Sequence, residues 1–398
     1  MTGILPLLVL WPLAAVALAS SAYVFGLTGL AAVARLRRRS PDRPLRPRTR
    51  FALLIPAHDE EQLIGRLLQS VSELDYPARL LDVYVIADNC TDATEARARA
   101  AGGRVLVRDD RERQGKGYAL SWALDNISLA GYDAVAMVDA DSVLHPNFLR
   151  EMEAYFADGA QAIQGYYGVL EADSSASTLR AVSFSLMHYV RPLGKTVFGG
   201  SCGLKGNGMV FAAELLLAQG WGAFSVVEDA EQHLRLVRDG VTVRFAPEAR
   251  VYGEMPASLS GARTQNLRWE AGRWSVARRY APSLLWLALR RRSLVVLDAA
   301  VEPLLPPLSV VAVLGLAVGV SGLALGNLSL ALAGGIVLAA LAAHVAGGML
   351  LSRAPLSAWR SLLTAPVYLP WKVALYAQAL LGAGAQRWVR TPRSPTKN

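Results

Sequence analysis

Long apolar stretches lie at both ends of the chain, and the central region between them alternates short apolar runs with amphipathic segments. No Asp, Glu, Lys or Arg occurs from residue 4 to residue 34, whereas a transmembrane helix needs only about 20 apolar residues. The stretch is too long for the core of a signal peptide, and no basic region precedes it. We therefore predict a retained transmembrane helix within residues 1–34.

The second apolar stretch lies near the C-terminus. Residues 303–352 contain no Asp, Glu, Lys or Arg, and glycines cluster around 321–327. Such a cluster indicates a break between two helices. We predict two transmembrane helices in the region 293–352, at about 294–320 and 328–351.

Ionisable residues at the edges of this stretch affect its interpretation. Asp298 and Glu302 lie early in the predicted span 294–320, one helical turn apart. Ionisable residues within a membrane are costly and often functional, but a hydrated pair near the lipid headgroups fits this position equally well. Segment 362–385 is broken by prolines and flanked by arginines, so we predict that 353–398 forms an interfacial or re-entrant segment with a basic cytoplasmic tail.

The central region, residues 51–258, has the pattern of strands that alternate with helices. Four apolar runs have the length of buried strands, and segments with helical spacing of apolar residues separate them. Strands connected by helices form parallel, doubly wound sheets, so we predict an α/β fold for this region. The predicted strands are FALLIPA (51–57), LDVYVIAD (81–88), RVLVRD (104–109) and AVAMVDAD (134–141).

The net charge of +9 includes a basic linker at 35–50, which holds eight arginines and one aspartate directly after the first predicted span. Nucleic acid is one partner for such a run. Its position beside a membrane helix instead favours contact with anionic membrane lipids and retention on the cytoplasmic side. We therefore predict no nucleic-acid partner, a multi-pass protein of the cell membrane, and a cytoplasmic location for residues 35–292. Cys90 and Cys202 would then be reduced, and two cysteines are too few for a zinc site.

Two carboxylates lie at the end of the predicted strand 134–141, where the chain leaves the sheet. Asp139 and Asp141 are two residues apart, at the carboxyl end of the strand, where open α/β sheets bind their ligands. Carboxylates so close repel each other unless a cation lies between them, and their hard oxygen atoms suit Mg²⁺ or Mn²⁺ with substrate phosphates. A solvated turn is the alternative interpretation, because Asp is common in turns.

Polar residues at other strand ends also have two interpretations each. The position of Asp88 at the end of the strand 81–88 favours contact with a nucleoside. Asp59 and Asp92 are more typical of helix caps. The loop QGKG around Lys116 resembles a phosphate-binding loop but lacks the spacing of a Walker motif.

Two segments further along the chain carry candidate chemistry. Glu228 and Asp229 open a predicted helix, where carboxylates act either as caps or as a general base at the rim of a crevice. Residues 259–292 are rich in arginine and tryptophan and include the run QNLRW, which begins at Gln265. Their composition predicts amphipathic helices that lie on a membrane.

In chain order these residues resemble the D, DxD, ED and QxxRW motifs of the membrane-integrated family 2 glycosyltransferases, the group of the cellulose, chitin and hyaluronan synthases. The run LLIPAHDEE is similar to the first strand and helix of that family. The resemblance covers residues 51–274 and implies an α/β, GT-A type (Rossmann-like) cytoplasmic domain with flanking transmembrane helices. The chain departs from the pattern at Val227, where many synthases have Thr, and three spans are fewer than the large synthases use for a polymer channel.

The resemblance implies a role for each matching residue, and the loop of Lys116 adds one phosphate contact. The implied site consists of Asp229 as catalytic base supported by Glu228; Asp141 and Asp139 as ligands of Mg²⁺ or Mn²⁺; Asp88, Asp139, Lys116, Gln265 and Arg268 as contacts of the nucleotide-sugar; and Trp269, Gly206 and Asn207 as contacts of the acceptor.

The implied activity is transfer of a sugar from a UDP-sugar, with inversion to a β-linkage, because the site has one base and no enzymic nucleophile. The acceptor is a polysaccharide or a lipid, and the QxxRW motif slightly favours a polysaccharide. A catalytically silent, membrane-anchored subunit of a polysaccharide synthase complex is the alternative. The presence of Asp141, Asp229 and Arg268 together argues against it. A homo-oligomer or a synthase complex is compatible with either interpretation.

Overall fold

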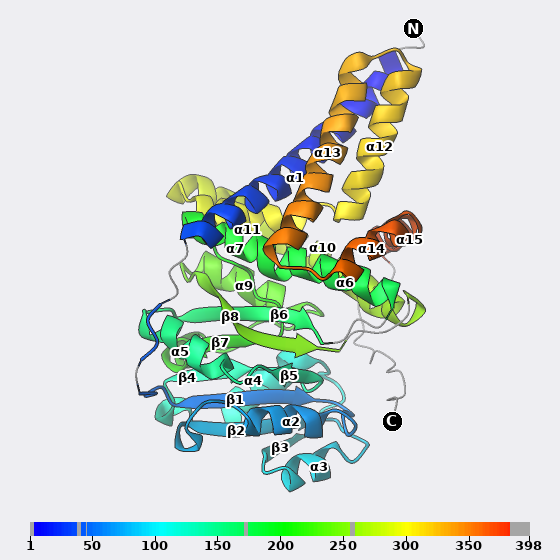
Figure 1. Cartoon of the computed structure of the whole chain (residues 1–398). Coiled ribbons are helices and arrows are strands. Elements are labelled where there is room, and N and C mark those ends of the chain that lie inside the picture. Colours follow the sequence, from blue (N-terminus) through cyan, green and yellow to red (C-terminus); the bar gives the residue numbers. More distant parts are fainter. Residues whose placement is uncertain (1–3, 38–40, 45, 171–173, 255–258, 383–398) are drawn as a thin grey trace.

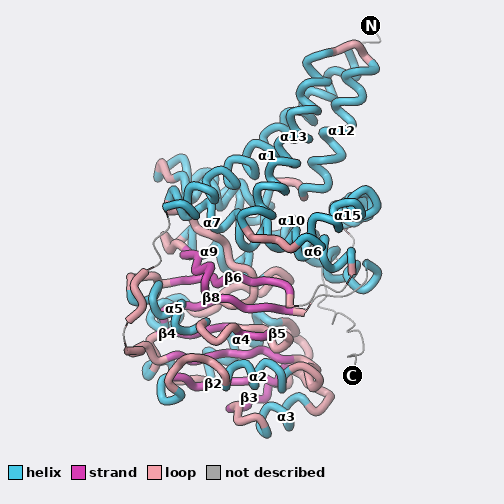
Figure 2. Tube along the Cα trace, viewed as in Figure 1, coloured by secondary structure: helices cyan, strands magenta, loops and turns pink. Residues whose placement is uncertain are grey.

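The computed structural model describes the chain except for residues 1–3, 38–40, 45, 171–173, 255–258 and 383–398. A domain built on one sheet forms one end of the molecule, and the long helices α1, α12 and α13 project from the other end (Figure 1). Further helices lie between these two parts, as the colouring in Figure 2 shows. The predicted basic tail from residue 383 onward lies outside the described residues.

The strands β3, β2, β1 and β4, in that order, form the parallel part of the sheet. Each starts where a strand was predicted, because buried parallel strands are short, continuous apolar runs, but β3 ends one residue and β4 four residues before the predicted end. Phe51 at the start of β1 lies opposite Leu81 in β2 and Ala134 in β4, so the three strands start in register. Their carboxyl ends therefore reach the same edge of the sheet. The strands are β1 (Phe51–Ala57), β2 (Leu81–Asp88), β3 (Arg104–Arg108) and β4 (Ala134–Met137).

Beyond β4 the sheet continues through β7, β6, β8 and β5, which were not among the four predicted strands, and it becomes mixed, with β6 and β8 parallel to each other. β7 is antiparallel to β4 and β6, and β5 is antiparallel to β8. Glycines with positive φ before β7 allow the chain to reverse its direction. After the turn, the amide of Gly208 donates to the carbonyl of Met137, the last residue of β4, at 3.1 Å. The chain thus enters at the carboxyl end of β4 and runs back along it. These strands are β5 (Ser142–Leu144), β6 (Ala162–Val169), β7 (Met209–Ala212) and β8 (Val243–Gly253).

Alternate residues of β1 face two different cores, as the pleat of a strand requires. Leu53 and Ile55 belong to the core beneath α2 and α5. Leu54 belongs to the core beneath α4, which continues to Ala31 of α1 and Met349 of α13. One apolar core therefore joins the sheet domain to the long helices. The helices of the sheet domain are α2 (Ile64–Ser72), α3 (Thr94–Ala100), α4 (Lys116–Asn126), α5 (Phe148–Ala157), α8 (Ala213–Gln219) and α9 (Glu228–Arg238).

Two helices in the described part of the chain are long and apolar enough to cross a membrane, α1 (Ile4–Arg37) and α13 (Leu328–Leu351). The region predicted as one helix at 294–320 instead contains α11 (Leu294–Val301) and α12 (Leu308–Ala324), with a bend of 74° between them. The prediction of a continuous helix is wrong because prolines without an amide hydrogen lie at the break. A third span exists only if this bent pair crosses as one unit.

Helix α10 (Leu259–Arg291) packs against α9, α11 and α15, between the sheet domain and the long helices (Figure 1). It forms one continuous helix across the predicted amphipathic region. α15 (Ala365–Leu380), from the segment predicted to be interfacial, packs against α10 and α12. The remaining elements are α6 (Ser175–Ser185), a π-helical turn (Leu186–Val190), α7 (Arg191–Lys195), α14 (Leu356–Ser361) and 3₁₀ turns at Ala78–Leu80, Leu129–Gly131, Thr196–Phe198, Glu302–Leu304 and Leu362–Thr364.

A buried ion cluster joins α7 to α11 and α1. The Nζ of Lys195 is fully buried, 2.7 Å from Oδ2 of Asp298 and 2.7 Å from Oε2 of Glu302. The hydroxyl of Tyr23 in α1 donates to the other carboxylate oxygen of Asp298 at 2.8 Å. The interpretation of Asp298 and Glu302 as a merely hydrated pair is therefore wrong, because both carboxylates form ion pairs with the same buried lysine.

Candidate active site

A cavity of about 1560 Å³ opens at the carboxyl ends of β1, β2 and β4 and extends to α12 and α13. Ligand crevices of α/β sheets lie at this edge. Segments that are far apart in the sequence contribute to its wall. Of the predicted site residues, the cavity is lined by Asp88, Lys116, Asp139, Asp141, Gly206, Glu228, Asp229, Gln265, Arg268 and Trp269.

Lys116, the first residue of α4, connects three of these segments. Its ammonium group forms an ion pair with Asp139 and donates to the carbonyl of Gly206. It also lies 3.7 Å from Oε1 of Glu228. Burial alone would lower the pKa of Lys116, but the carboxylates of Asp139 and Glu228 outweigh it and raise that pKa. The lysine therefore stays charged beside the acidic residues, as a phosphate contact requires.

Asn207 holds the turn that carries Asp139 and Asp141. Its side-chain carbonyl accepts from the amide of Asp139 at 3.2 Å, and its amide group donates to the hydroxyl of Ser142 at 2.8 Å. Asn207 is fully buried and is not part of the cavity wall. The prediction that it contacts the acceptor is wrong, because both of its polar groups are used to position this turn.

Glu228 and Asp229 lie in the first turn of α9, but neither caps it: the residue at the cap position is Val227, without a side-chain hydrogen bond. A Cβ atom at Gly206 would lie 3.4 Å from Oδ2 of Asp229, so that carboxylate faces the glycine turn. Burial raises the pKa of Glu228 to about 7, against the effect of Lys116. Burial also raises the pKa of Asp229. A carboxylate with a raised pKa is a stronger base, which suits proton abstraction.

Asp88 is held by Arg108, a residue that the motif pattern did not reveal. The guanidinium of Arg108 lies 2.6 Å from Oδ1 of Asp88, and both side chains are less than one-tenth exposed. Burial raises the pKa of Asp88, while Arg108 acts in the opposite direction. The two residues are opposite each other in the parallel pairing of β2 with β3. The sequence offered a signal for this pair, since Asp88 ends one predicted strand and Arg108 is the second-last residue of the next.

Trp269 of the QxxRW motif lies near a group of aromatic residues that the sequence patterns did not reveal. The ring of Trp269 lies 6.2 Å from that of Phe184, which packs 4.4 Å from His188. Tyr167 stacks on His188 with ring centroids 5.3 Å apart. Burial lowers the pKa of His188 to about 3, so the imidazole is neutral. These rings form a wall with apolar ring faces and polar groups at the ring edges, and the apolar face of a sugar can pack on such a surface.

Arg268 lies on the same helix as Trp269 and also lines the cavity. Burial lowers the pKa of Arg268, and Glu228 acts against this shift, which places the guanidinium within electrostatic range of the α9 carboxylates. A guanidinium remains charged under these conditions. Arg268 of α10 and Lys116 of α4 thus bring positive charge to the acidic cavity from two helices that are far apart in the sequence.

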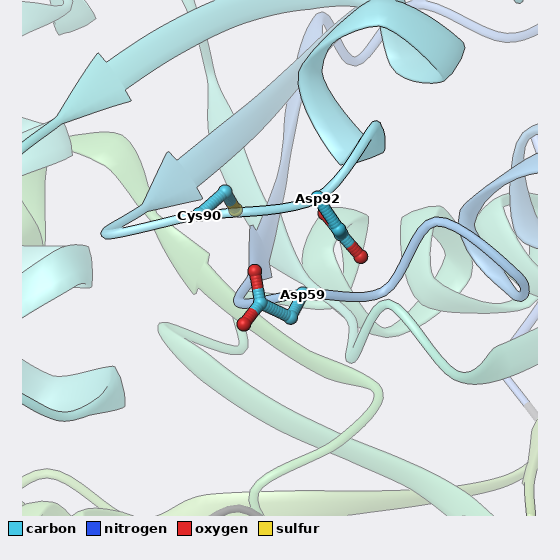
Figure 3. Close-up of side chains that lie close together, drawn as sticks. All are labelled: Asp59, Cys90 and Asp92. Carbon is cyan, nitrogen blue, oxygen red and sulfur yellow. The ribbon is translucent and has the colours of Figure 1, made fainter.

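Outside the cavity, Asp59, Cys90 and Asp92 lie close together on the loops after β1 and β2 (Figure 3). One ligand atom from each lies within 4.8 Å of the others, which is close enough for a cation. The carboxylates instead bind the backbone: Asp59 accepts from the amide of Thr91 at 2.6 Å, and Asp92 from that of Thr94 at 2.9 Å at the start of α3. Burial raises the pKa of the Cys90 thiol, and a protonated thiol is a poor metal ligand. The prediction of helix capping fits Asp92, which accepts at the start of α3, whereas the carboxylate of Asp59 binds the loop after β2 instead of a helix end.

Comparison with solved structures identifies the type of fold. A mannosyltransferase from Pyrobaculum calidifontis, solved in complex with GDP-Man and Mn²⁺, superimposes with a TM-score of 0.53 at 20% identity. The match covers 93% of this chain and 99% of that one. The fold is therefore a mixed α/β sheet of GT-A type, with two candidate transmembrane helices that flank the domain.

Curated relatives match a smaller part of the chain. A beta-monoglucosyldiacylglycerol synthase from Synechocystis sp. is 29% identical over 205 residues, which are 48% of this chain and 40% of the synthase. Glucomannan 4-beta-mannosyltransferase 7 from Arabidopsis thaliana is 22% identical over 245 residues, 58% of this chain and 44% of the plant enzyme. The matches thus span less than two thirds of the length of these relatives.

The family model "Glycosyltransferase like family 2" matches residues 47–272, more than half of the chain. The match begins just before β1 and ends in α10, beyond Trp269. It therefore includes every predicted site residue and the sheet edge on which the cavity lies. By sheet architecture, cavity and family match alike, the chain belongs to glycosyltransferase family 2.

Proposed function

We propose that the chain transfers a sugar from a UDP-sugar to a lipid acceptor, with inversion to a β-linkage, at the cytoplasmic face of a membrane. One observation carries the proposal. A single cavity is lined at one end by Asp139, Asp141 and Asp229, and at the other by apolar residues of α12 and α13. A polar donor and an apolar acceptor can enter such a cavity from different sides.

The carboxylates of Asp139 and Asp141 fit a divalent metal ion. Both line the cavity, both supply hard oxygen atoms, and the Asn207 contacts fix the turn between them. Mg²⁺ or Mn²⁺ bound there would compensate the negative charge of the diphosphate leaving group. Lys116 and Arg268 would add positive charge around the same phosphates.

Asp229 is the proposed base for the acceptor hydroxyl. It lies in the cavity wall, faces the turn at Gly206, and has its pKa raised by burial. The hydroxyl would lose its proton to Asp229 as its oxygen attacks the anomeric carbon and the bond to the diphosphate breaks. Direct attack on that carbon inverts its configuration. Glu228, on the same helical turn and 3.7 Å from Lys116, would support the charge balance.

The apolar end of the cavity favours a lipid over a polysaccharide, although the QxxRW motif by itself slightly favours a polysaccharide. Leu308 and Ala312 of α12 and Leu338, Leu341 and Val345 of α13 line it. Sugar rings pack mainly on aromatic rings, whereas acyl chains gain free energy by leaving water for aliphatic side chains such as these. A glucolipid synthase and a polymer-forming mannosyltransferase are both among the relatives, so family membership alone does not separate these acceptors.

The same arrangement supports a membrane topology with the sheet domain inside the cell. α1, the bent pair α11–α12 and α13 would form three crossings, and the arginines that end α1 would stay on the cytoplasmic side. The proposed location is a multi-pass protein in the cell membrane. Cysteine labelling from outside should then modify introduced cysteines only in the α12–α13 connection and before α1.

The activity is tested with the full chain in phospholipid nanodiscs that contain diacylglycerol and Mn²⁺. Radiolabelled UDP-glucose, UDP-galactose, UDP-N-acetylglucosamine and GDP-mannose are supplied one at a time, and the product is divided into lipid and polymer fractions. We expect label in the lipid fraction from one UDP-sugar, with a β-anomeric coupling by NMR. Label in polymer alone, or an α-linkage, would contradict the acceptor or the inversion respectively.

Replacing Asp141 with alanine is expected to weaken Mn²⁺-dependent UDP binding by at least about tenfold, because even outer-shell partners of a metal cost about 10- to 100-fold when removed. Calorimetric titration of UDP with and without Mn²⁺ measures the effect. Asp125→Ala, which removes an exposed carboxylate from α4, is the matched control. Equal UDP affinity for both variants in Mn²⁺ would exclude Asp141 as a metal ligand.

A further inference from the structure

Arg180, in α6, is a buried cation to which the described residues offer no partner. Only 5% of the residue is exposed. Its Nε and Nη2 atoms are shielded from solvent and make no hydrogen bond within the described chain. Burial lowers the pKa of Arg180, with Tyr368 acting in the opposite direction. A guanidinium nevertheless stays charged, and an unpaired buried charge is costly, so its place in the cavity wall indicates an anionic ligand.

Glu270, a carboxylate in the same cavity wall, is already paired with other cations. Lys372 of α15 donates to Oδ1 of Asn266 at 2.6 Å and to Oε1 of Glu270 at 3.2 Å. Arg273 lies 3.0 Å from the second carboxylate oxygen of Glu270. Burial lowers the pKa of Lys372, and Arg273 and Arg180 lower it further against the effect of Glu270. Two cations therefore share the carboxylate of Glu270, and the nearby Arg180 adds a third positive charge, which leaves an excess of positive charge.

Arg180 lies between the aromatic wall and the C-terminal helices. Phe184, one helical turn further along α6, has its ring 6.2 Å from that of Trp269. Leu362 and Leu369, from the turn before α15 and from α15 itself, line the same cavity, and α14 packs against α6. The cavity wall that contains the unpartnered guanidinium thus also carries a polar, sugar-type surface and an apolar one. A phospholipid likewise joins a polar head group and acyl chains through its phosphate.

We propose that Arg180 binds the phosphate of a phospholipid, and that the acceptor is consequently a phospholipid with a hydroxylated head group. The inference rests on the proposed function for the identity of the cavity as the acceptor site. The guanidinium of Arg180 would donate to two phosphate oxygens. Lys372 and Arg273 would add positive potential while they keep their ion pairs with Glu270. The lipid's hydroxyl, rather than its phosphate, would then reach the base.

The test measures lipid binding without any sugar donor, so that it does not depend on transfer. Dioctanoyl phosphatidylglycerol, dioctanoylglycerol and inorganic phosphate are each titrated calorimetrically into the full chain in an uncharged detergent. We expect the phospholipid to bind at least about tenfold more tightly than the diacylglycerol. Arg180→Gln should weaken phospholipid binding by about 10- to 100-fold, the range for a lost charge-assisted pair, and leave diacylglycerol binding unchanged.

Two variants keep the outcome clear. Arg278→Gln removes an exposed arginine of α10 that lies over Trp274, outside the cavity wall, and should change nothing. Arg180→Lys keeps the charge but loses the fork, and should give an intermediate affinity if the glutamine variant does not fold. Equal affinity for the phospholipid and the diacylglycerol in the unaltered chain overturns the proposal, as does a preference for inorganic phosphate over the phospholipid. Weaker UDP binding in Arg180→Gln would reassign the arginine to the donor, whereas loss of transfer with intact lipid binding would count against the proposed function alone.

Discussion

Replacing Asp229 with asparagine is expected to lower the rate of sugar transfer by about 10²- to 10⁴-fold, the usual contribution of a general base. The carboxamide has nearly the same shape but cannot take the proton of the acceptor hydroxyl. Mn²⁺-dependent UDP binding should be retained, because Asp139, Asp141 and Lys116 carry the proposed nucleotide contacts. Turnover at saturating donor and calorimetric titration of UDP measure the two properties separately.

The control for this variant is Asp239→Asn, an exposed carboxylate just after the end of α9 that pairs with Arg238. It removes one charge near the same helix but outside the cavity. Its transfer rate should equal that of the unaltered chain. A fully active Asp229→Asn variant would remove the base assignment, and an inactive one that also lost UDP binding would assign Asp229 to the nucleotide.

Replacing Lys195 with methionine is expected to destabilise the fold by about 3–5 kcal/mol, because removal of one partner leaves buried charge uncompensated. The methionine fills most of the volume, so the loss comes mainly from electrostatics. Asp298 and Glu302 would then face each other without the cation that lies 2.7 Å from each. The midpoint of thermal unfolding in detergent measures the effect.

The double replacement Asp298→Asn and Glu302→Gln in the Lys195→Met background should recover a large part of the lost stability, since it removes the unpaired charges. Arg99→Met, at an exposed ion pair with Glu95, is the matched control and should cost less than about 1 kcal/mol. A Lys195→Met variant as stable as the control would mean that the ion cluster does not hold α7 against α11.

The effect of this cluster on function is distinct from that of Asp229. Glu302 also lines the cavity, so the same ion pairs connect the helix bundle to the proposed acceptor end. We expect Lys195→Met to reduce the amount of folded protein, while Asp229→Asn reduces turnover per folded molecule. Activity normalised to folded protein separates the two.

The local pattern of the sequence determined the elements whose stability depends on their own residues. β1 and β2 have the predicted bounds because a buried parallel strand is a continuous apolar run. The position of Asp88, Asp139 and Asp141 at one sheet edge follows, since parallel strands in register end together. The helix over Glu228 and Asp229 and the long helix that carries Arg268 were predicted in the same way.

Only the tertiary structure decided which distant side chains meet. The antiparallel β7, the Asn207 contacts with the Asp139 turn and the bend between α11 and α12 each depend on how segments pack after they form. Lys195 pairs with Asp298 across 103 positions of the chain, and the Nε and Nη2 atoms of Arg180 have no hydrogen-bond partner among the described residues. Periodicity records which face of an element is apolar, but the neutralisation of a buried charge depends on atoms that are close in space and remote in sequence.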